Sequence, residues 1–119
     1  MSGDEGAEPP KPKEKPTAFV NLEMFTVNLQ PEDSGQFLQV GLTVKTRESP
    51  VGAAIAKQMP EIRNRILMLL SSKKAADVAG IVGKQQLSQQ ITEEIKQSMG
   101  SDELKEDVLE VLFTSFVIQ

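Results

Sequence analysis

The stretch 108-VLEVLFTSFVIQ-119 decides the fold class, because it predicts a β-strand that follows a long region of helical pattern. Its two alternating sets of side chains are both mostly apolar, as in a strand at the centre of a sheet. Free chain ends fray unless other structure holds them. We therefore expect this segment to lie in the middle of its own sheet or to meet a partner across its free side, with Phe113, Phe116 and Ile118 stabilising the sheet.

Two earlier segments also have strand patterns. Residues 37–46, FLQVGLTVKT, alternate strictly and predict a half-buried strand with its apolar side chains on one face: Leu38, Val40, Leu42 and Val44. Residues 19–29, FVNLEMFTVNL, put Leu22 and Met24 on the face opposite Phe25. Their change of phase indicates either a β-bulge or a strand covered on both sides. The sequence QPEDSGQ between the two segments has the composition of a hairpin loop.

The middle of the chain switches to helical periodicity. Ser49 and Pro50 are typical of a helix start, and Pro60 starts or kinks the next helix. The segment after Pro60 has the strongest helical pattern of the chain. Its expected apolar stripe is Ile62, Ile66, Leu69 and Leu70, and its expected solvent-facing residues are Arg63, Asn64 and Lys73.

A second helical pattern follows over residues 84–100. Gly100 is its expected C-cap. Its apolar stripe is narrower and consists of Leu87, Ile91, Ile95 and Met99. A short helix or turn ending at Gly80 or Gly83 precedes it. Two strands, two or three helices and one returning strand predict an α+β fold, in which a small antiparallel or mixed sheet has the helices packed on one face.

Composition divides the chain into two parts. Residues 1–16, MSGDEGAEPPKPKEKP, contain most of the prolines and no large side chain to bury, which predicts a disordered linker rich in Pro, Lys and Glu, or a tail added in cloning. Residues 17–119 have the length of one domain. No apolar run approaches the roughly 18 to 20 residues that span a bilayer.

The amino acid composition argues against an enzymatic function. The 119 residues include no His, Cys, Trp or Tyr, so the commonest proton-transfer group and transition-metal ligand are missing. A net charge of -4 argues against capture of nucleic acid or anionic lipid. We expect no catalytic residues, no cofactor and no metal site.

The short motifs support the same expectation. GIVGK has the wrong spacing for a phosphate-binding loop, and Gln85 stands where Ser or Thr would bind magnesium. The acidic runs at 93–94 and 102–107 are typical of solvated surfaces. Arg63 and Arg65 are the candidate interaction residues, because arginine suits bidentate contacts with a partner, although solvent-facing helix charges are the commoner case.

Residues 19–119 resemble the periplasmic domain of the FliL family of flagellar basal body-associated proteins. The resemblance is carried by the order of NLEMFTVNL, FLQVGLTVKT, MPEIRNRILMLLSSK, GKQQLSQQI and the terminal VLFTSFVIQ. It implies a domain similar to the stomatin and prohibitin domains of membrane scaffold proteins. It also implies a single-pass inner-membrane protein whose transmembrane helix is absent from this chain.

The resemblance further implies a non-enzymatic accessory role in motility and swarming. The implied partners are further copies in a ring and the stator proteins, MotA and MotB or their sodium-driven counterparts, beside the basal body. A different class of function stays open on the residues alone: a soluble binding module or chaperone-like adaptor that captures a partner strand at a sheet edge.

Overall fold

The computed structural model describes residues 16–119, in which three strands form one antiparallel sheet and five α-helices cover it. The strands, in the spatial order β1-β2-β3, are β1 (Thr17–Asn28), β2 (Phe37–Arg47) and β3 (Val108–Ile118). The helices are α1 (Val51–Lys57), α2 (Met59–Ser71), α3 (Ala75–Val78), α4 (Gly80–Gln97) and α5 (Asp102–Glu106). The predicted α+β class is confirmed, with more helices than the two or three expected.

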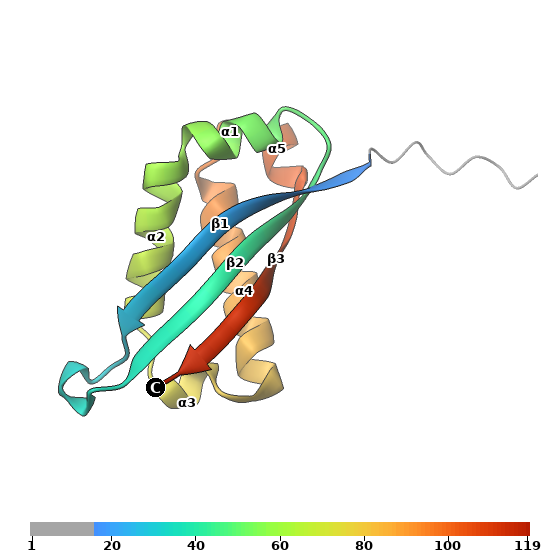
Figure 1. Ribbon diagram of the computed structural model, residues 1–119. Helices are drawn as coiled ribbons and strands as arrows, with labels where there is room; N and C mark the ends of the chain where they lie inside the picture. The colour runs from blue at the N-terminus through green and yellow to red at the C-terminus, as the bar shows by residue number, and fades with distance from the viewer. Residues whose placement is uncertain (1–15) are drawn as a thin grey trace, which may run out of the picture.

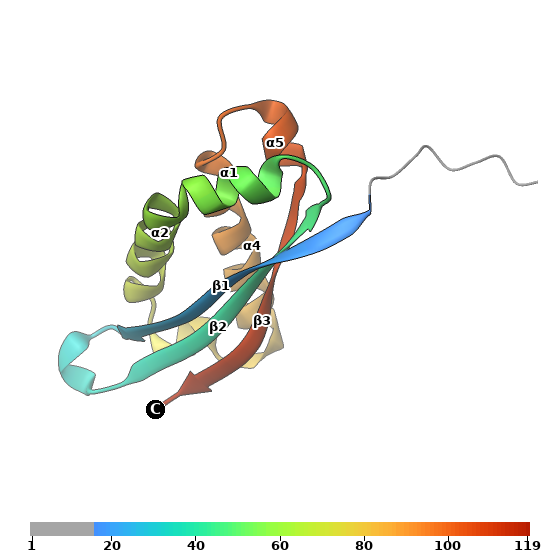
Figure 2. The same cartoon turned by 45° about the horizontal axis from the view of Figure 1, so that its top comes forward.

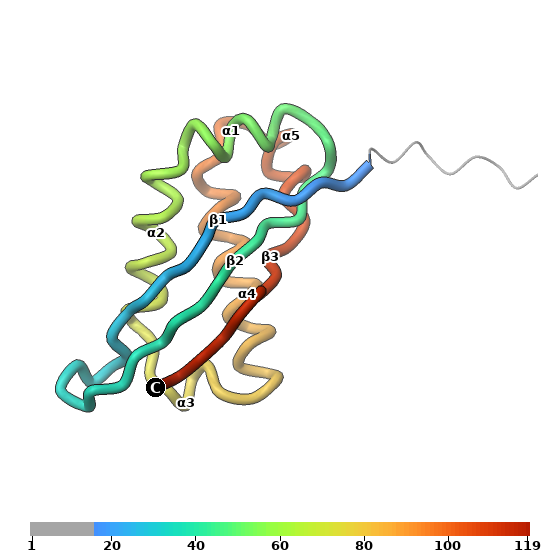
Figure 3. Tube along the Cα trace, in the orientation of Figure 1, coloured from blue at the N-terminus to red at the C-terminus, as the bar shows by residue number. Residues whose placement is uncertain are grey.

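All the helices lie on one side of the sheet, so the molecule has two layers (Figure 1, Figure 2). The opposite side of the sheet, which we call the outer face, has no helix over it in either view. The Cα trace shows β1 and β3 on either side of β2, with the C-terminus beside the end of β2 that follows the hairpin (Figure 3). There Phe37 and Gln119 exchange two backbone hydrogen bonds of 2.8 and 2.9 Å.

The central strand is β2, not β3. Of the two alternatives for the last segment, a position in the middle of the sheet is therefore wrong, and a partner across its free side stays a prediction. The four apolar side chains predicted to share one face of β2 are all fully buried against the helices. On β3, by contrast, Leu112 is 37% exposed and Val117 is 42% exposed. The apolar second face of β3 therefore reflects the uncovered outer face and not a central position.

A β-bulge in β1 explains the change of phase in its sequence. The pairing register of β1 with β2 shifts between Asn21 and Glu23, and Glu23 has a φ of 67°. The extra residue turns both Leu22 and Phe25 into the core. Of the two explanations for the change of phase, the β-bulge is confirmed, although it lies a few residues earlier than predicted. The prediction that Leu22 shares a face with Met24 is wrong.

The core lies between the sheet and the two longer helices. Ile62, Ile66 and Leu70 of α2 are fully buried, as predicted, while Leu69 is half-buried. The whole predicted stripe of α4 is also buried. Because β2 contributes its complete apolar face, one cluster of side chains joins the sheet to both helices.

Two helix boundaries differ from expectation. Helix α4 ends at Gln97 with Ser98 as its cap, two residues before Gly100. The unpredicted α5 begins after Ser101, whose hydroxyl accepts a hydrogen bond from the Leu104 amide at 3.2 Å. The linker predicted for residues 1–16 lies outside the described residues except for Pro16. Within the described range, none of the helices combines the length and the apolar character needed to span a bilayer.

Replacing Ile66 by Ala should destabilise the fold, because Ile66 is fully buried between α2 and the sheet. We expect the free energy of unfolding to fall by about 2 to 5 kcal/mol. Met68 on the same helix is 68% exposed, so Met68→Ala should cost less than about 0.5 kcal/mol. Urea denaturation followed by circular dichroism measures both, and equal losses would contradict the assigned core.

Candidate interaction surface

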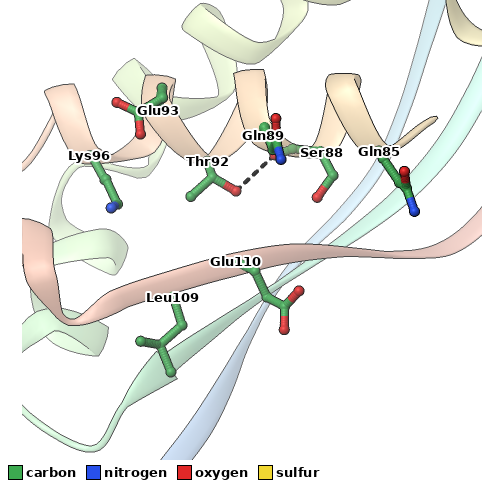
Figure 4. Close-up of a pocket in the computed structure, with 8 residues that line it drawn as sticks. All are labelled: Gln85, Ser88, Gln89, Thr92, Glu93, Lys96, Leu109 and Glu110. Carbon is green, nitrogen blue, oxygen red and sulfur yellow. Dashed lines mark hydrogen bonds between the residues drawn. The ribbon is translucent and has the colours of Figure 1, made fainter. Parts of the chain in front are cut away.

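The described residues include hollows in the surface but no cluster of metal ligands. Between residues 16 and 119, no three His, Cys, Asp or Glu side chains gather where they could hold a metal ion. An open groove of about 790 Å³ lies between α4 and β3 (Figure 4). Its lining is mainly amide, hydroxyl and charged side chains: Gln85, Ser88, Gln89, Thr92, Glu93, Lys96, Leu109 and Glu110.

Two groove residues are already engaged at the free edge of β3. Ser88 Oγ donates a hydrogen bond to the Val111 carbonyl at 2.6 Å, and the Val111 amide donates to Thr92 Oγ1 at 3.1 Å. Thr92 Oγ1 in turn donates to the Ser88 carbonyl at 2.8 Å, the bond drawn in Figure 4. Both backbone groups that Val111 presents away from β2 are thus satisfied by α4. A new strand cannot pair with β3 at this position without displacing both hydroxyls.

Arg63 of α2 binds the bulged part of β1 at its free edge. Its guanidinium donates to the Leu22 carbonyl at 2.5 Å and to the Met24 carbonyl at 3.1 Å. The same group lies over the Phe25 ring, 4.0 Å from the ring centroid. The prediction that Arg63 faces solvent is therefore wrong: its side chain is half-buried and binds the bulged strand.

Arg65 lies on the outer surface of the helical layer. It contacts Glu94 of α4 at 3.2 Å and Glu61 of its own helix at 3.3 Å, and it donates to Gln97 at 3.2 Å. The hydrogen bonds with Glu94 and Glu61 raise the pKa of the Arg65 guanidinium. The Arg65 side chain is about one-third exposed.

The two candidate arginines do not form one site. Arg63 donates hydrogen bonds to carbonyls of β1, and Arg65 of α2 forms an ion pair with Glu94 of α4. The residues expected to stabilise the sheet, Phe113, Phe116 and Ile118, are half-buried on the helix side of β3. The Phe113 and Phe116 rings form an edge-to-face pair at 5.3 Å, and the Lys84 ammonium lies 4.9 Å from the Phe116 ring.

The outer face of the sheet is the candidate interaction surface. It contains five of the exposed large apolar side chains among the described residues: Phe19, Met24, Phe37, Leu112 and Val117. Their register partners are Lys45, Gly41, Asn28, Thr43 and Gln39, in the same order. Charge on this face comes in pairs of opposite sign, because Lys45 lies across from Glu110, and Arg47 is 3.9 Å from Asp107.

Gly41 lies at the centre of the outer face. A Cβ there would come within 2.5 Å of Thr114 Oγ1 and 2.9 Å of Met24 Sδ. The Met24 side chain crosses this position and accepts a hydrogen bond from Ser115 Oγ at 3.6 Å. Gly41 therefore allows side chains from both edge strands to meet over β2.

Sequence reasoning missed the edge contacts of Ser88 and Thr92 and the apolar outer face. One available signal was the spacing of Ser88 and Thr92, four residues apart and therefore on one face of a helix. The apolar second face of β3 was noticed, but its exposure depends on where the helices pack, which one strand pattern does not specify.

Comparison with known proteins gives consistent matches over the folded part of the chain. A family model described as "Flagellar basal body-associated protein FliL" matches residues 19–119. The Flagellar protein FliL of Escherichia coli (strain K12) is 32% identical over 101 residues, covering 85% of this chain and 64% of that protein. The protein of the same name from Aquifex aeolicus is 27% identical over 95 residues, covering 80% and 56%. The chain thus spans less than two thirds of the length of these relatives.

Replacing Arg63 by Ala should open the edge of β1, because two strand carbonyls lose their donor. We expect the free energy of unfolding to fall by about 1.5 to 3 kcal/mol, the usual range for hydrogen bonds from a charged group. Arg65→Ala is the matched control and should cost less than about 1 kcal/mol, since its ion pairs are largely exposed. Urea denaturation gives both values, and a larger loss for Arg65→Ala would contradict the assignment.

Replacing Thr92 by Val should destabilise the edge of β3 at Val111. The substitution keeps the shape but removes the acceptor for the buried Val111 amide, which costs about 1 to 3 kcal/mol. Ser98→Ala, which removes only bonds of 3.5 Å, serves as the control. Hydrogen exchange should accelerate at Val111 in Thr92→Val alone. Unchanged exchange there would show that Thr92 does not protect the edge.

Proposed function

Because the chain belongs to the FliL family of flagellar basal body-associated proteins, we propose that it is a non-enzymatic accessory domain of the flagellar motor. The observation that carries this proposal is the family match over residues 19–119, which runs from within β1 to the end of the chain. The lack of His and Cys in the sequence agrees with a scaffolding role. The domain would then act by binding and positioning other proteins.

The finer part of the proposal concerns partners. We infer that the domain associates with the stator complex and assembles with further copies into a ring around it. In this arrangement residues 17–119 form a periplasmic domain, and residues 1–16 act as a linker to a transmembrane helix that precedes them. Tethering to a membrane raises the local concentration of copies, so contacts that are weak in dilute solution become sufficient for assembly.

Arg65 is the better of the two arginines for a contact with the stator. Arg63 is occupied by two backbone carbonyls and an aromatic ring of its own domain. Arg65 is partly exposed and pairs with two glutamates, so it can exchange one of them for a carboxylate of a partner.

The alternative function, capture of a partner strand at a sheet edge, has less support. On the edge of β3, hydroxyls of α4 form hydrogen bonds with both backbone groups of Val111. On the edge of β1, Arg63 donates to two backbone carbonyls. Natural proteins close edges in such ways to prevent pairing with foreign strands. We therefore rank the motor scaffold first.

The motor proposal predicts that cells lacking the protein lose motility in viscous medium and that the anchored, fluorescently labelled protein gathers at motors only when the stator is present. A charge-swap pair tests Arg65. Arg65→Glu breaks the pair with Glu94, and adding Glu94→Arg restores a pair of opposite sign within the domain.

If Arg65 meets the stator, motility falls in the single variant and stays low in the double variant. Rescue by the double variant would assign Arg65 a role within the domain only. Labelled protein that gathers equally at motors without the stator would refute stator association, and normal motility of the deletion strain at every load would refute the accessory role.

A further inference from the structure

Met24 lies on the outer face, in a row of three residues that crosses the sheet. Its register partner on β2 is Gly41, and the register partner of Gly41 on β3 is Ser115. The pairing register shifts next to Ser115, so Thr114 is an extra residue of β3 beside this row. We propose that Met24 is an oxidation site whose sulfoxide oxygen is held by the hydroxyls of Thr114 and Ser115.

The sulfur and the two hydroxyls converge on one position above Gly41. A Cβ at Gly41 would lie 2.9 Å from Met24 Sδ. The same Cβ would lie 2.5 Å from Thr114 Oγ1 and 3.2 Å from Ser115 Oγ. Consecutive residues of a regular strand point to opposite faces, so the irregularity of β3 is what brings two neighbouring hydroxyls to this place. Because glycine has no Cβ, an oxygen atom bonded to the sulfur can enter the position.

The unmodified sulfur uses these hydroxyls poorly. Ser115 Oγ donates to Met24 Sδ at 3.6 Å, and a thioether sulfur is a weak acceptor. Among the methionine sulfurs of residues 16–119, that of Met24 alone accepts a hydrogen bond. Oxidation to the sulfoxide makes the side chain polar and chiral. The new oxygen is a stronger acceptor for the same hydroxyls, so oxidation joins β1 to β3 across β2.

The solvent reaches Met24, whose exposed fraction is 44%. Met68 on α2 is 68% exposed, and no hydroxyl donates to its sulfur. Exposure by itself therefore favours oxidation of Met68. The feature that is particular to Met24 is the pair of hydroxyls, which favours one side of the sulfur over the other.

The oxidant is a peroxide, and hydrogen peroxide is the simplest case. A lone pair of Met24 Sδ attacks one peroxide oxygen, the O–O bond breaks and an S–O bond forms. The sulfur loses two electrons to the peroxide. The hydrogen of the transferred hydroxyl moves to the departing hydroxide, which leaves as water. A peroxide that is hydrogen-bonded to Thr114 or Ser115 is presented to the lone pair on the same side.

The modification changes the outer face reversibly. A sulfoxide puts a strong dipole between the exposed apolar side chains of the face, and methionine sulfoxide reductases restore the thioether. A partner that needs an apolar surface there loses contact area on oxidation. The inference does not rest on the motor role, because it concerns the chemistry of the domain itself.

The stereochemistry of the product tests the site. The full chain is treated with hydrogen peroxide and digested, and the peptides that contain Met24 and Met68 are separated by mass spectrometry. Two reductases, each specific for one epimer of methionine sulfoxide, then give the ratio of epimers in each peptide. At Met24 we expect one epimer in about two- to tenfold excess, the preference that one net hydrogen bond confers. At Met68 we expect equal amounts.

Matched variants show whether the hydroxyls are responsible. Thr114→Val with Ser115→Ala removes both hydroxyls, and the Met24 ratio should fall to that of Met68. Thr114→Ser with Ser115→Thr keeps both hydroxyls and should keep the preference. Circular dichroism verifies the fold of each variant, and Ser115→Ala alone, which should lower the preference, replaces the first variant if that does not fold.

Urea denaturation tests the link between the edge strands. In a Met68→Leu background, oxidation should favour the folded state of the protein with both hydroxyls over that of the variant without them, by about two- to tenfold in the unfolding equilibrium constant. Equal epimers at Met24, the same excess without the hydroxyls, or no difference in the effect of oxidation on unfolding would each overturn the inference.

Discussion

The rest of this structure depends on the small size of its sheet. A sheet of three strands has two edge strands, like any larger open sheet, but only one strand that is paired on both sides. Among the strands of residues 16–119, β2 alone is paired on both sides. Its buried face supplies the platform on which α2 and α4 pack. β1 and β3 each present one row of backbone groups away from β2, and these rows need partners or protection.

The helical layer therefore does more than cover apolar side chains. From α2, Arg63 reaches the bulged part of β1, and from α4, Ser88 and Thr92 reach Val111 of β3. These contacts fix each helix relative to one edge, whereas apolar packing alone is tolerant of small sliding. The bulge is part of the same arrangement, because it turns the Leu22 side chain into the core while the carbonyls of Leu22 and Met24 accept hydrogen bonds from Arg63.

Periodicity predicted the features that depend on neighbours in sequence. The strict alternation of β2 and the four-residue repeat of α4 were sufficient because each element buries one complete face. The position of β3 could not be predicted in the same way, since an apolar second face is equally compatible with a central strand and with an edge strand whose outer face is uncovered. Arg63 was misplaced because its partner Leu22 is 41 residues away, and a helical pattern carries no information on such contacts.

The contacts along the two edges and the uncovered outer face bear on how this domain can associate with a partner. Extending the sheet at Val111 or at Leu22 and Met24 would break the hydroxyl contacts or the arginine contacts there, each of which would leave a backbone group without its partner. Packing on the outer face breaks none of these contacts, because their donors and acceptors lie along the edges. Gly41 leaves room on that face for the side chains of Met24 and Thr114 over the centre of β2. A partner strand that pairs at Val111 or at the bulged part of β1 would therefore have to displace a side chain of the helical layer first, whereas a partner on the outer face would not.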